Sequence, residues 1–199
     1  MSARRAEVSR TTGETDVSLR LALDGHGEGT RDTGIGFLDH MLDLLARHGG
    51  LELDVKVSGD LRTGAHHTVE DTGIVIGHAL DSALGDRAGI ARYGHAVIPM
   101  DEARASATID ISGRPFASVT GFERLPPGEI AGFEHDVAEE FFRAVAGAAR
   151  LTLHIDLQQG TNAHHMIEAC FKAFARALRE ATASDPSEPG IPSTKGTLT

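Results

Sequence analysis

The chain has 199 residues, which is enough for one domain or two small ones. Its 40% hydrophobic and 24% charged residues exclude wholesale disorder, collagen-like repeats and a membrane bundle. With 29 acidic against 19 basic residues, the net charge of −10 argues against nucleic acid or an anionic membrane as partner. The single cysteine, Cys170, favours a reducing compartment, and residues 1–10 carry no apolar signal segment, so we expect a cytoplasmic protein.

One unit occurs twice along the chain. The motif His-His-x-x-Glu at 66–70 returns at 164–168, and the alternating segment 51–55 returns at 151–155. The copies are 98 positions apart in the first case and 100 in the second, so the loop before the second motif is two residues shorter. Similarity of this kind indicates a duplicated supersecondary unit. We predict a first repeat over 1–90, a second over 91–183 and a Pro/Ser-rich C-terminal tail over 184–199.

The first repeat is predicted to contain two strands and two helices. Apolar residues alternate over 16–23, which is typical of a half-buried strand. Apolar residues at helical spacing predict a helix over 37–47, and the glycine pair that follows ends it. A second strand over 51–57 leads to a helix over 66–84, for which Thr63 is the expected N-cap.

The second repeat follows the same order. The same patterns predict strands over 104–111 and 151–157 and helices over 137–149 and 164–182, with Asn162 as the N-cap of the last helix. Strands followed by helices, twice, predict an α+β fold of two tandem pseudo-symmetric repeats, each a small sheet packed against helices. The tail is rich in proline and serine and is not expected to form a helix.

Histidine is the unusual residue of the composition, with 11 copies against 8 phenylalanines, one tyrosine and no tryptophan. On a helix, adjacent residues point about 100° apart, whereas residues three or four apart share a face. Each His-His-x-x-Glu motif can therefore offer a His–Glu pair to one ion and its other histidine to a second. The motif at matching positions of both repeats predicts two metal sites, with these ligands: His66, His67, Glu70, His164, His165 and Glu168.

A third ligand for each site is expected from elsewhere in the same repeat, on its first helix. His40 lies beside the apolar stripe of the helix over 37–47, and its counterpart in the second repeat is Glu140. Histidine and carboxylate donors without a thiol favour manganese, iron, zinc or cobalt, and the affinity order does not choose among them. Cys170 lies off the ligand face of its helix and is expected to pack in the core.

Basic residues gather around this framework in an otherwise acidic chain. Lys172 shares a helix face with Glu168, and Arg92 and Arg114 bracket the first predicted strand of the second repeat. Lys195 lies in the tail. Any one of them is an ordinary surface charge, but together they predict a pocket for a phosphate group.

Six segments are highly specific for one family when they occur together. In chain order they read GFLDHMLD at 36–43, AHHTVED at 65–71, PMDEA at 99–103, SGRP at 112–115, AHHMIEA at 163–169 and IPSTKG at 191–196. On these segments the chain resembles imidazoleglycerol-phosphate dehydratase, an enzyme of histidine biosynthesis. The resemblance implies an α+β fold with halves of the ribosomal protein S5 domain 2-like type.

The resemblance also implies a reaction. A hydro-lyase of this family removes water from D-erythro-imidazole-glycerol phosphate and gives imidazole acetol phosphate. Hydroxide leaves the carbon attached to the imidazole ring, and the scarcely acidic proton leaves the next carbon, so a metal-bridged imidazolate would help the side chain lose hydroxide. The family uses two manganese ions per active site. Its members assemble into a cage of twenty-four subunits with sites between subunits.

Position by position, the resemblance assigns a role to each candidate. It gives the metal ligands as His40, His66, His67, Glu70, Glu140, His164, His165 and Glu168, where Glu140 replaces a histidine of some members. It assigns proton transfer to Glu14, whose counterpart in the second repeat is Glu102. It assigns phosphate binding to Arg92, Arg114, Lys172, Ser193 and Lys195, so the tail is expected to fold over the substrate.

Two other functions use the same ligands. A dinuclear metallohydrolase would activate a bridging water and would need no slot for an imidazole ring. A non-catalytic metal-storage or scaffold protein would leave Glu14, the arginines and the lysine-bearing tail without a role. An assay on phosphate esters separates the hydrolase from the dehydratase.

Overall fold

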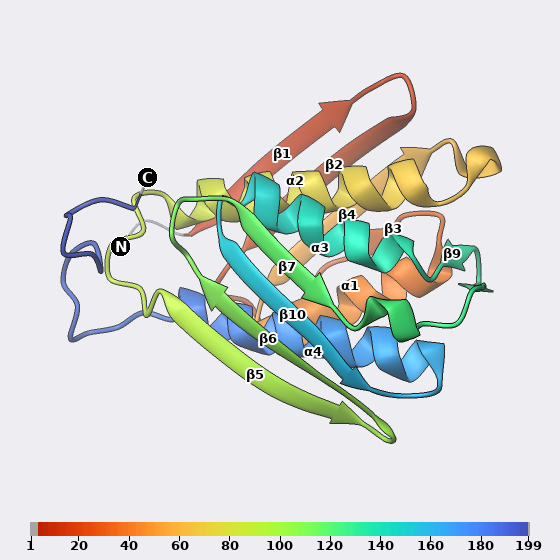
Figure 1. Cartoon of the computed structure of the whole chain (residues 1–199). Coiled ribbons are helices and arrows are strands. Elements are labelled where there is room, and N and C mark those ends of the chain that lie inside the picture. Colours follow the sequence, from red (N-terminus) through yellow and green to blue (C-terminus); the bar gives the residue numbers. More distant parts are fainter. Residues whose placement is uncertain (1–3, 199) are drawn as a thin grey trace.

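The computed structural model describes residues 4–198, in which two sheets enclose a layer of helices (Figure 1). The first sheet is formed, in spatial order, by β1 (Arg5–Thr11), β2 (Thr15–Ala22), β4 (Glu52–Gly59) and β3 (Arg31–Asp32). The second is formed by β5 (Tyr93–Met100), β6 (Ala103–Asp110), β10 (Thr152–Gln159) and β7 (Phe116–Thr120). The helices are α1 (Gly36–Gly49), α2 (His66–Leu84), α3 (Val137–Ala148) and α4 (Ala163–Thr182). The short elements are η1 (Leu61–Thr63), η2 (Phe122–Arg124), β8 (Glu129–Ile130) and β9 (Phe133–Glu134).

The two sheets have the same topology. In each, the first three strands in spatial order pair antiparallel and the last strand pairs parallel to its neighbour. Each sheet therefore uses the strands of one repeat in the same order, which confirms the predicted α+β fold of two pseudo-symmetric halves.

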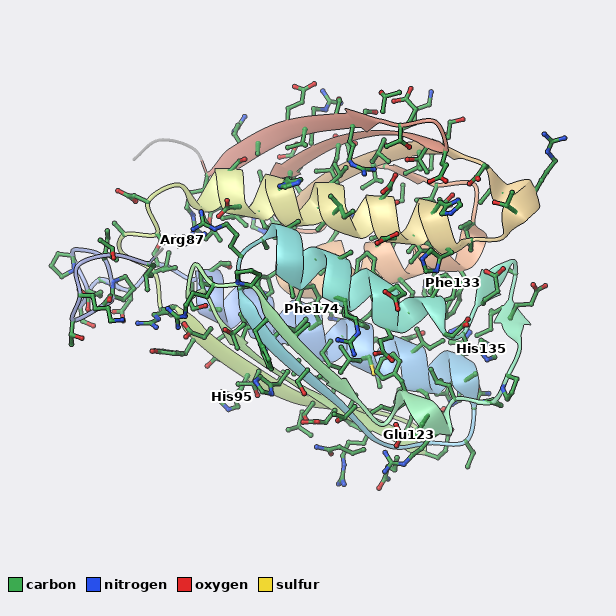
Figure 2. The ribbon with its side chains drawn as sticks, turned by 45° about the horizontal axis from the view of Figure 1, so that its top comes forward. Arg87, His95, Glu123, Phe133, His135 and Phe174 are labelled. Atoms are coloured by element: carbon green, nitrogen blue, oxygen red, sulfur yellow. The ribbon has the colours of Figure 1, made fainter. Side chains whose placement is uncertain are left out.

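The helices pair across the two repeats. α2 packs on β1 and β2, and α4 packs on β5 and β6, so each long helix covers the sheet of its own repeat. In contrast, α1 of the first repeat contacts α4 of the second, and α3 contacts α2. Figure 2 shows the sheets on opposite sides of this helical layer. The exchange matters for function because it brings His40 of the first repeat to His164 and Glu168 of the second, so the expectation that His40 joins the His–Glu pair of its own repeat is wrong.

Alternation and helical stripes place the core where the sequence predicts it. On β2 the inward side chains Val17, Leu19 and Leu21 are buried while their neighbours are exposed. Between α3 and α4, the rings of Phe141 and Phe171 lie 4.9 Å apart, and other phenylalanines surround them. Burying a side chain of this size stabilises the fold by about 1.5–3 kcal/mol. Cys170 is fully buried, as expected, and burial raises the pKa of its thiol.

The predicted helices and strands are confirmed to within about two residues, but one predicted helix cap is wrong. Thr63 is not the N-cap of α2: it lies in η1, where its hydroxyl donates to Asp60, and α2 is preceded by Ala65 without a side-chain cap. Asn162 does cap α4, since its side chain accepts from the backbone N–H of His164. Strands β1, β5 and β7 were not predicted.

The tail packs against the rest of the chain over its described residues. The backbone N–H of Gly89 donates to Gly190 at 2.8 Å, and the guanidinium of Arg87 donates to the carbonyl of Leu198. The Leu198 side chain is 5% exposed. The segment is therefore anchored at both ends although it has no regular structure. Among the described helices, no stretch is long and apolar enough to cross a membrane.

Candidate active site

Three predicted ligands converge where α1 meets α4. The Nε2 atoms of His40 and His164 lie 3.3 and 3.0 Å from the same oxygen, Oε2 of Glu168. One donor atom from each residue lies within 4.8 Å of the other two, and in the described part of the chain this is the one group of three that meets this limit. Two imidazole nitrogens and one carboxylate oxygen at such distances form a donor set suited to a divalent transition metal.

The electrostatics of this cluster favour an ionised carboxylate. Glu168 is 5% exposed, and burial alone would raise its pKa. Hydrogen bonding to Lys172 and to the two histidines outweighs burial and lowers the pKa of Glu168 below its ordinary value. The ammonium of Lys172 lies 2.5 Å from Oε1, the oxygen that does not face the histidines. Glu168 therefore keeps one oxygen for a metal while the other is held by Lys172.

The first repeat carries a looser version of the same cluster. His66 Nε2 lies 3.7 Å from Glu70 on α2, and Glu140 lies on the neighbouring helix α3. A Cβ added at Gly73 would lie 2.9 Å from the Ala144 side chain, so the two helices touch closely at this level. The three residues His66, Glu70 and Glu140, equivalent by symmetry to His164, Glu168 and His40, do not converge within 4.8 Å.

The second histidine of each pair faces a different carboxylate. His67 Nδ1 lies 3.0 Å from Asp60, and His165 Nδ1 lies 2.8 Å from Glu102. These hydrogen bonds raise the pKa of both histidines above the ordinary value. Glu14, on the hairpin between β1 and β2, lies 3.7 Å from the other ring nitrogen of His67.

The pKa of Glu102 is lowered to about 2, first by its hydrogen bond to His165 and then by backbone N–H groups. The side chain of Glu102 beside His165 is therefore ionised at neutral pH. Sequence reasoning did not predict Asp60 at all, because a single acid in a loop carries no pattern. The repeat did draw attention to Glu102, although not to this contact.

Most predicted phosphate ligands lie together at the far end of α4. Arg92, Arg114, Ser193 and Lys195 line a cavity of about 820 Å³ between the start of β5 and the tail. Arg92 donates to Asp110 at 2.7 Å and to the carbonyl of Pro192, also at 2.7 Å, which fixes the tail against it. Lys172 does not line this cavity and lies beside Glu168 instead.

The metal cluster and this cavity are far apart within one chain. The backbone N–H of Arg92 donates to Ala181 at 2.9 Å, near the end of α4, whereas His164 lies at its beginning. At 1.5 Å per residue, the helix separates the two by roughly 25 Å. A small phosphorylated molecule cannot contact both groups of the same chain.

Comparison with known proteins identifies the family. The model of the family "Imidazoleglycerol-phosphate dehydratase" matches residues 33–178. The chain belongs to the imidazoleglycerol-phosphate dehydratase family. A family member from Gluconobacter oxydans is 51% identical over 98% of this chain and 98% of its own length. One from Alcanivorax borkumensis is 52% identical over 100% of this chain and 97% of its own.

Solved structures of family members have the same fold. The imidazoleglycerol-phosphate dehydratase of Staphylococcus aureus is similar with a TM-score of 0.81 and 43% identity, over 90% of this chain and 99% of that one. The Pyrococcus furiosus protein, solved in complex with (S)-C348, has a TM-score of 0.81 and 37% identity, over 96% of this chain and 100% of that one. The resemblance inferred from the six sequence segments is confirmed.

Proposed function

We propose that this chain dehydrates D-erythro-imidazole-glycerol phosphate to imidazole acetol phosphate and water, as a cytoplasmic enzyme of histidine biosynthesis. The observation that carries the proposal is the convergence of His40, His164 and Glu168, in a chain of this family, on one point suited to a metal ion. The exposed cationic cavity supports the phosphate part of the substrate. The lone buried cysteine supports a reducing compartment.

The active site holds two manganese ions. The donor chemistry fits, since imidazole and carboxylate groups bind this class of ion and no thiolate competes for it. One ion would be held by His40, His164 and Glu168. The other would be held by His66, Glu70 and Glu140. When bound, the ions supply the positive charge that favours the anionic form of the imidazole ring.

Each site is shared between copies of the chain in a cage of twenty-four subunits. Two arguments support the sharing of sites between copies. The roughly 25 Å between His164 and Arg92 requires that a second copy supply the phosphate pocket. In addition, Nδ1 of His67 and of His165 is engaged by a carboxylate of its own chain, whereas each Nε2 lies 3.7–3.9 Å from the nearest acid, beyond hydrogen-bond distance, and can complete a site on a neighbour.

The chain's own side chains perform the remaining chemistry. The reaction breaks a C–H bond and a C–OH bond of the glycerol part, and the resulting enol becomes the ketone of the product. Glu14 takes the proton from carbon and returns one to the departing hydroxide, so that water leaves. Arg92, Arg114 and Lys195 bind the phosphate, and Lys172 neutralises the buried Glu168.

Product formation from metal-stripped protein, with and without added manganese, tests the proposal. We expect activity only with manganese. Glu14→Gln should lose turnover and keep its metal, whereas Glu7→Gln, an exposed acid on the same hairpin, should behave like wild type. Release of inorganic phosphate in place of the ketone would favour the metallohydrolase. Metal uptake without any reaction would favour a storage or scaffold protein.

A further inference from the structure

His165 is held by a carboxylate that is itself fixed on its other side. Glu102 Oε2 accepts from His165 Nδ1 at 2.8 Å. Its second oxygen, Oε1, accepts from the backbone N–H of Thr161 at 3.1 Å and of Asn162 at 2.8 Å. These contacts join the turn between β5 and β6 to the first turn of α4. Neither oxygen is free to move without the loss of a hydrogen bond.

His67 has an equivalent partner from a different part of the fold. Its Nδ1 lies 3.0 and 3.2 Å from the two oxygens of Asp60, which precedes η1 in the loop before α2. The hydroxyl of Thr63 donates to the same carboxylate at 2.9 Å. The same ring nitrogen is therefore engaged by a carboxylate in both repeats, and each carboxylate has a second anchor.

An ionised carboxylate only accepts hydrogen bonds, so the proton of each neutral ring must sit on Nδ1. The lone pair is then on Nε2, the nitrogen that faces away from the carboxylate. A metal ligand needs this lone pair, and a fixed partner on the opposite nitrogen sets both the tautomer and the ring orientation.

We propose that Asp60 and Glu102 are positioning residues that present Nε2 of His67 and His165 to the two metal ions of neighbouring subunits. This rests on the proposed function for the identity of the ions and the sharing of sites. The carboxylates contact the histidines and do not themselves bind metal or substrate. Glu168 is held in place by burial in the core. Asp60 and Glu102 hold the more exposed rings of His67 and His165 in place by hydrogen bonds.

The two repeats provide this carboxylate differently for a steric reason. The position that corresponds to Asp60 in the second repeat is Gly160, where an added Cβ would lie 2.3 Å from the Met166 side chain. The second repeat has no room for an acid there, and Glu102 reaches the histidine from the adjacent hairpin instead.

The position that corresponds to Glu102 in the first repeat is Glu14. Because Asp60 already engages Nδ1 of His67, Glu14 is not needed there, and it lies on the Nε2 side at 3.7 Å. This difference between the repeats explains why Glu14 is available for proton transfer and the equivalent Glu102 is not.

Manganese affinity and the histidine tautomers test the proposal in the full-length protein. We expect Glu102→Ala and Asp60→Ala to weaken manganese binding by about 10–100-fold. Glu102→Gln should recover part of the affinity, because its amide oxygen still accepts from Nδ1. Glu180→Ala is the matched control, since Glu180 pairs with the exposed His95 on β5 at 3.4 Å and should leave affinity unchanged.

Nitrogen-15 spectra of the metal-free protein report the tautomer directly. At alkaline pH, where the rings are neutral, wild type should show His67 and His165 with the proton on Nδ1, and each alanine variant should lose this preference at its own histidine only. Wild-type manganese affinity together with an unchanged tautomer in both alanine variants would overturn the proposal. If manganese-loaded wild type forms no ketone while the alanine variants still lose manganese affinity, the proposed reaction is overturned and the positioning role is intact.

Discussion

The substitution Gly94→Ala is expected to destabilise the fold, and the size of the loss follows from one close contact between β5 and α4. This buried glycine of β5 lies against α4, and an added Cβ would be 2.0 Å from the carbonyl oxygen of Ala177 and 2.7 Å from the nitrogen of Ala181. Both neighbours are helix backbone and cannot rotate away. Gly94→Ala must therefore separate β5 from α4 by roughly 1 Å, which a close-packed interior resists.

The expected loss in free energy of unfolding is about 1–2 kcal/mol. Overpacking costs about 1–3 kcal/mol, and the smaller chain entropy of alanine returns roughly 0.5–1 kcal/mol. In a chain of this size, 1 kcal/mol corresponds to about 2–4 °C, so Tm should fall by about 5 °C. The KM for substrate should rise as well, because Arg92 is hydrogen-bonded to Ala181 and would move with the end of α4.

Gly147→Ala is the control with the same chemical change. Gly147 lies on the exposed side of α3, and an added Cβ meets nothing within 4 Å. Here only helix propensity acts, and Tm should rise by about 2 °C. Thermal unfolding followed by circular dichroism measures both. A Gly94→Ala protein as stable as wild type would show that β5 and α4 are less tightly packed than the structure indicates.

Three further predictions concern the site. Lys172→Met should destabilise metal-free protein by about 2 kcal/mol and manganese-loaded protein by less, since a bound ion neutralises Glu168; thermal melts with chelator and with manganese compare them. Asn162→Ala should cost about 1 kcal/mol through the lost N-cap of α4, measured by urea unfolding. The stabilising pair of Glu102 and His165 should be strongest between about pH 4.5 and 6.5 in metal-free protein. The carboxylate, with its lowered pKa, loses its contribution as pH falls toward about 2, and the histidine, with its raised pKa, loses its own as pH rises. Urea midpoints of wild type and Glu102→Gln across this range should diverge most in that window and approach each other outside it.

The sequence predicted those elements whose burial has a clear period. β2 alternates buried and exposed residues strictly, and the helices carry apolar stripes. β1 and β5 escaped prediction because they are partly exposed edge strands: no residue of β1 is buried, and β5 has one buried residue, Gly94. The Thr63 cap failed because the longer loop of the first repeat folds into η1 and carries the threonine away from α2.

The residues of the candidate site could be predicted from the sequence, but their positions relative to one another could not. Repetition drew attention to the paired histidines and to His40, whose contact with Glu168 needs only that α1 and α4 pack together. Sequence spacing does not show that helices of different repeats exchange partners. Nor does it show that Arg92 lies at the opposite end of α4 from His164, which is a consequence of β5 running along the whole helix.

The duplicated fold suits the proposed substrate because an imidazole ring also has two nearly equivalent halves. In the proposed site, the two ring nitrogens would bind two ions, and the two repeats would supply two ligand sets at related positions. The dehydration itself is not symmetric, since one carbon loses a proton and its neighbour loses hydroxide. Proton transfer therefore needs an acid on one side of the ring only. In our proposal, Asp60 positions His67 of the first repeat and Glu14 remains available for proton transfer, whereas Gly160 offers no side chain in the second repeat and Glu102 positions His165 instead. Asp60 in one repeat and Gly160 in the other are thus sufficient to make the two halves of a symmetric scaffold chemically different.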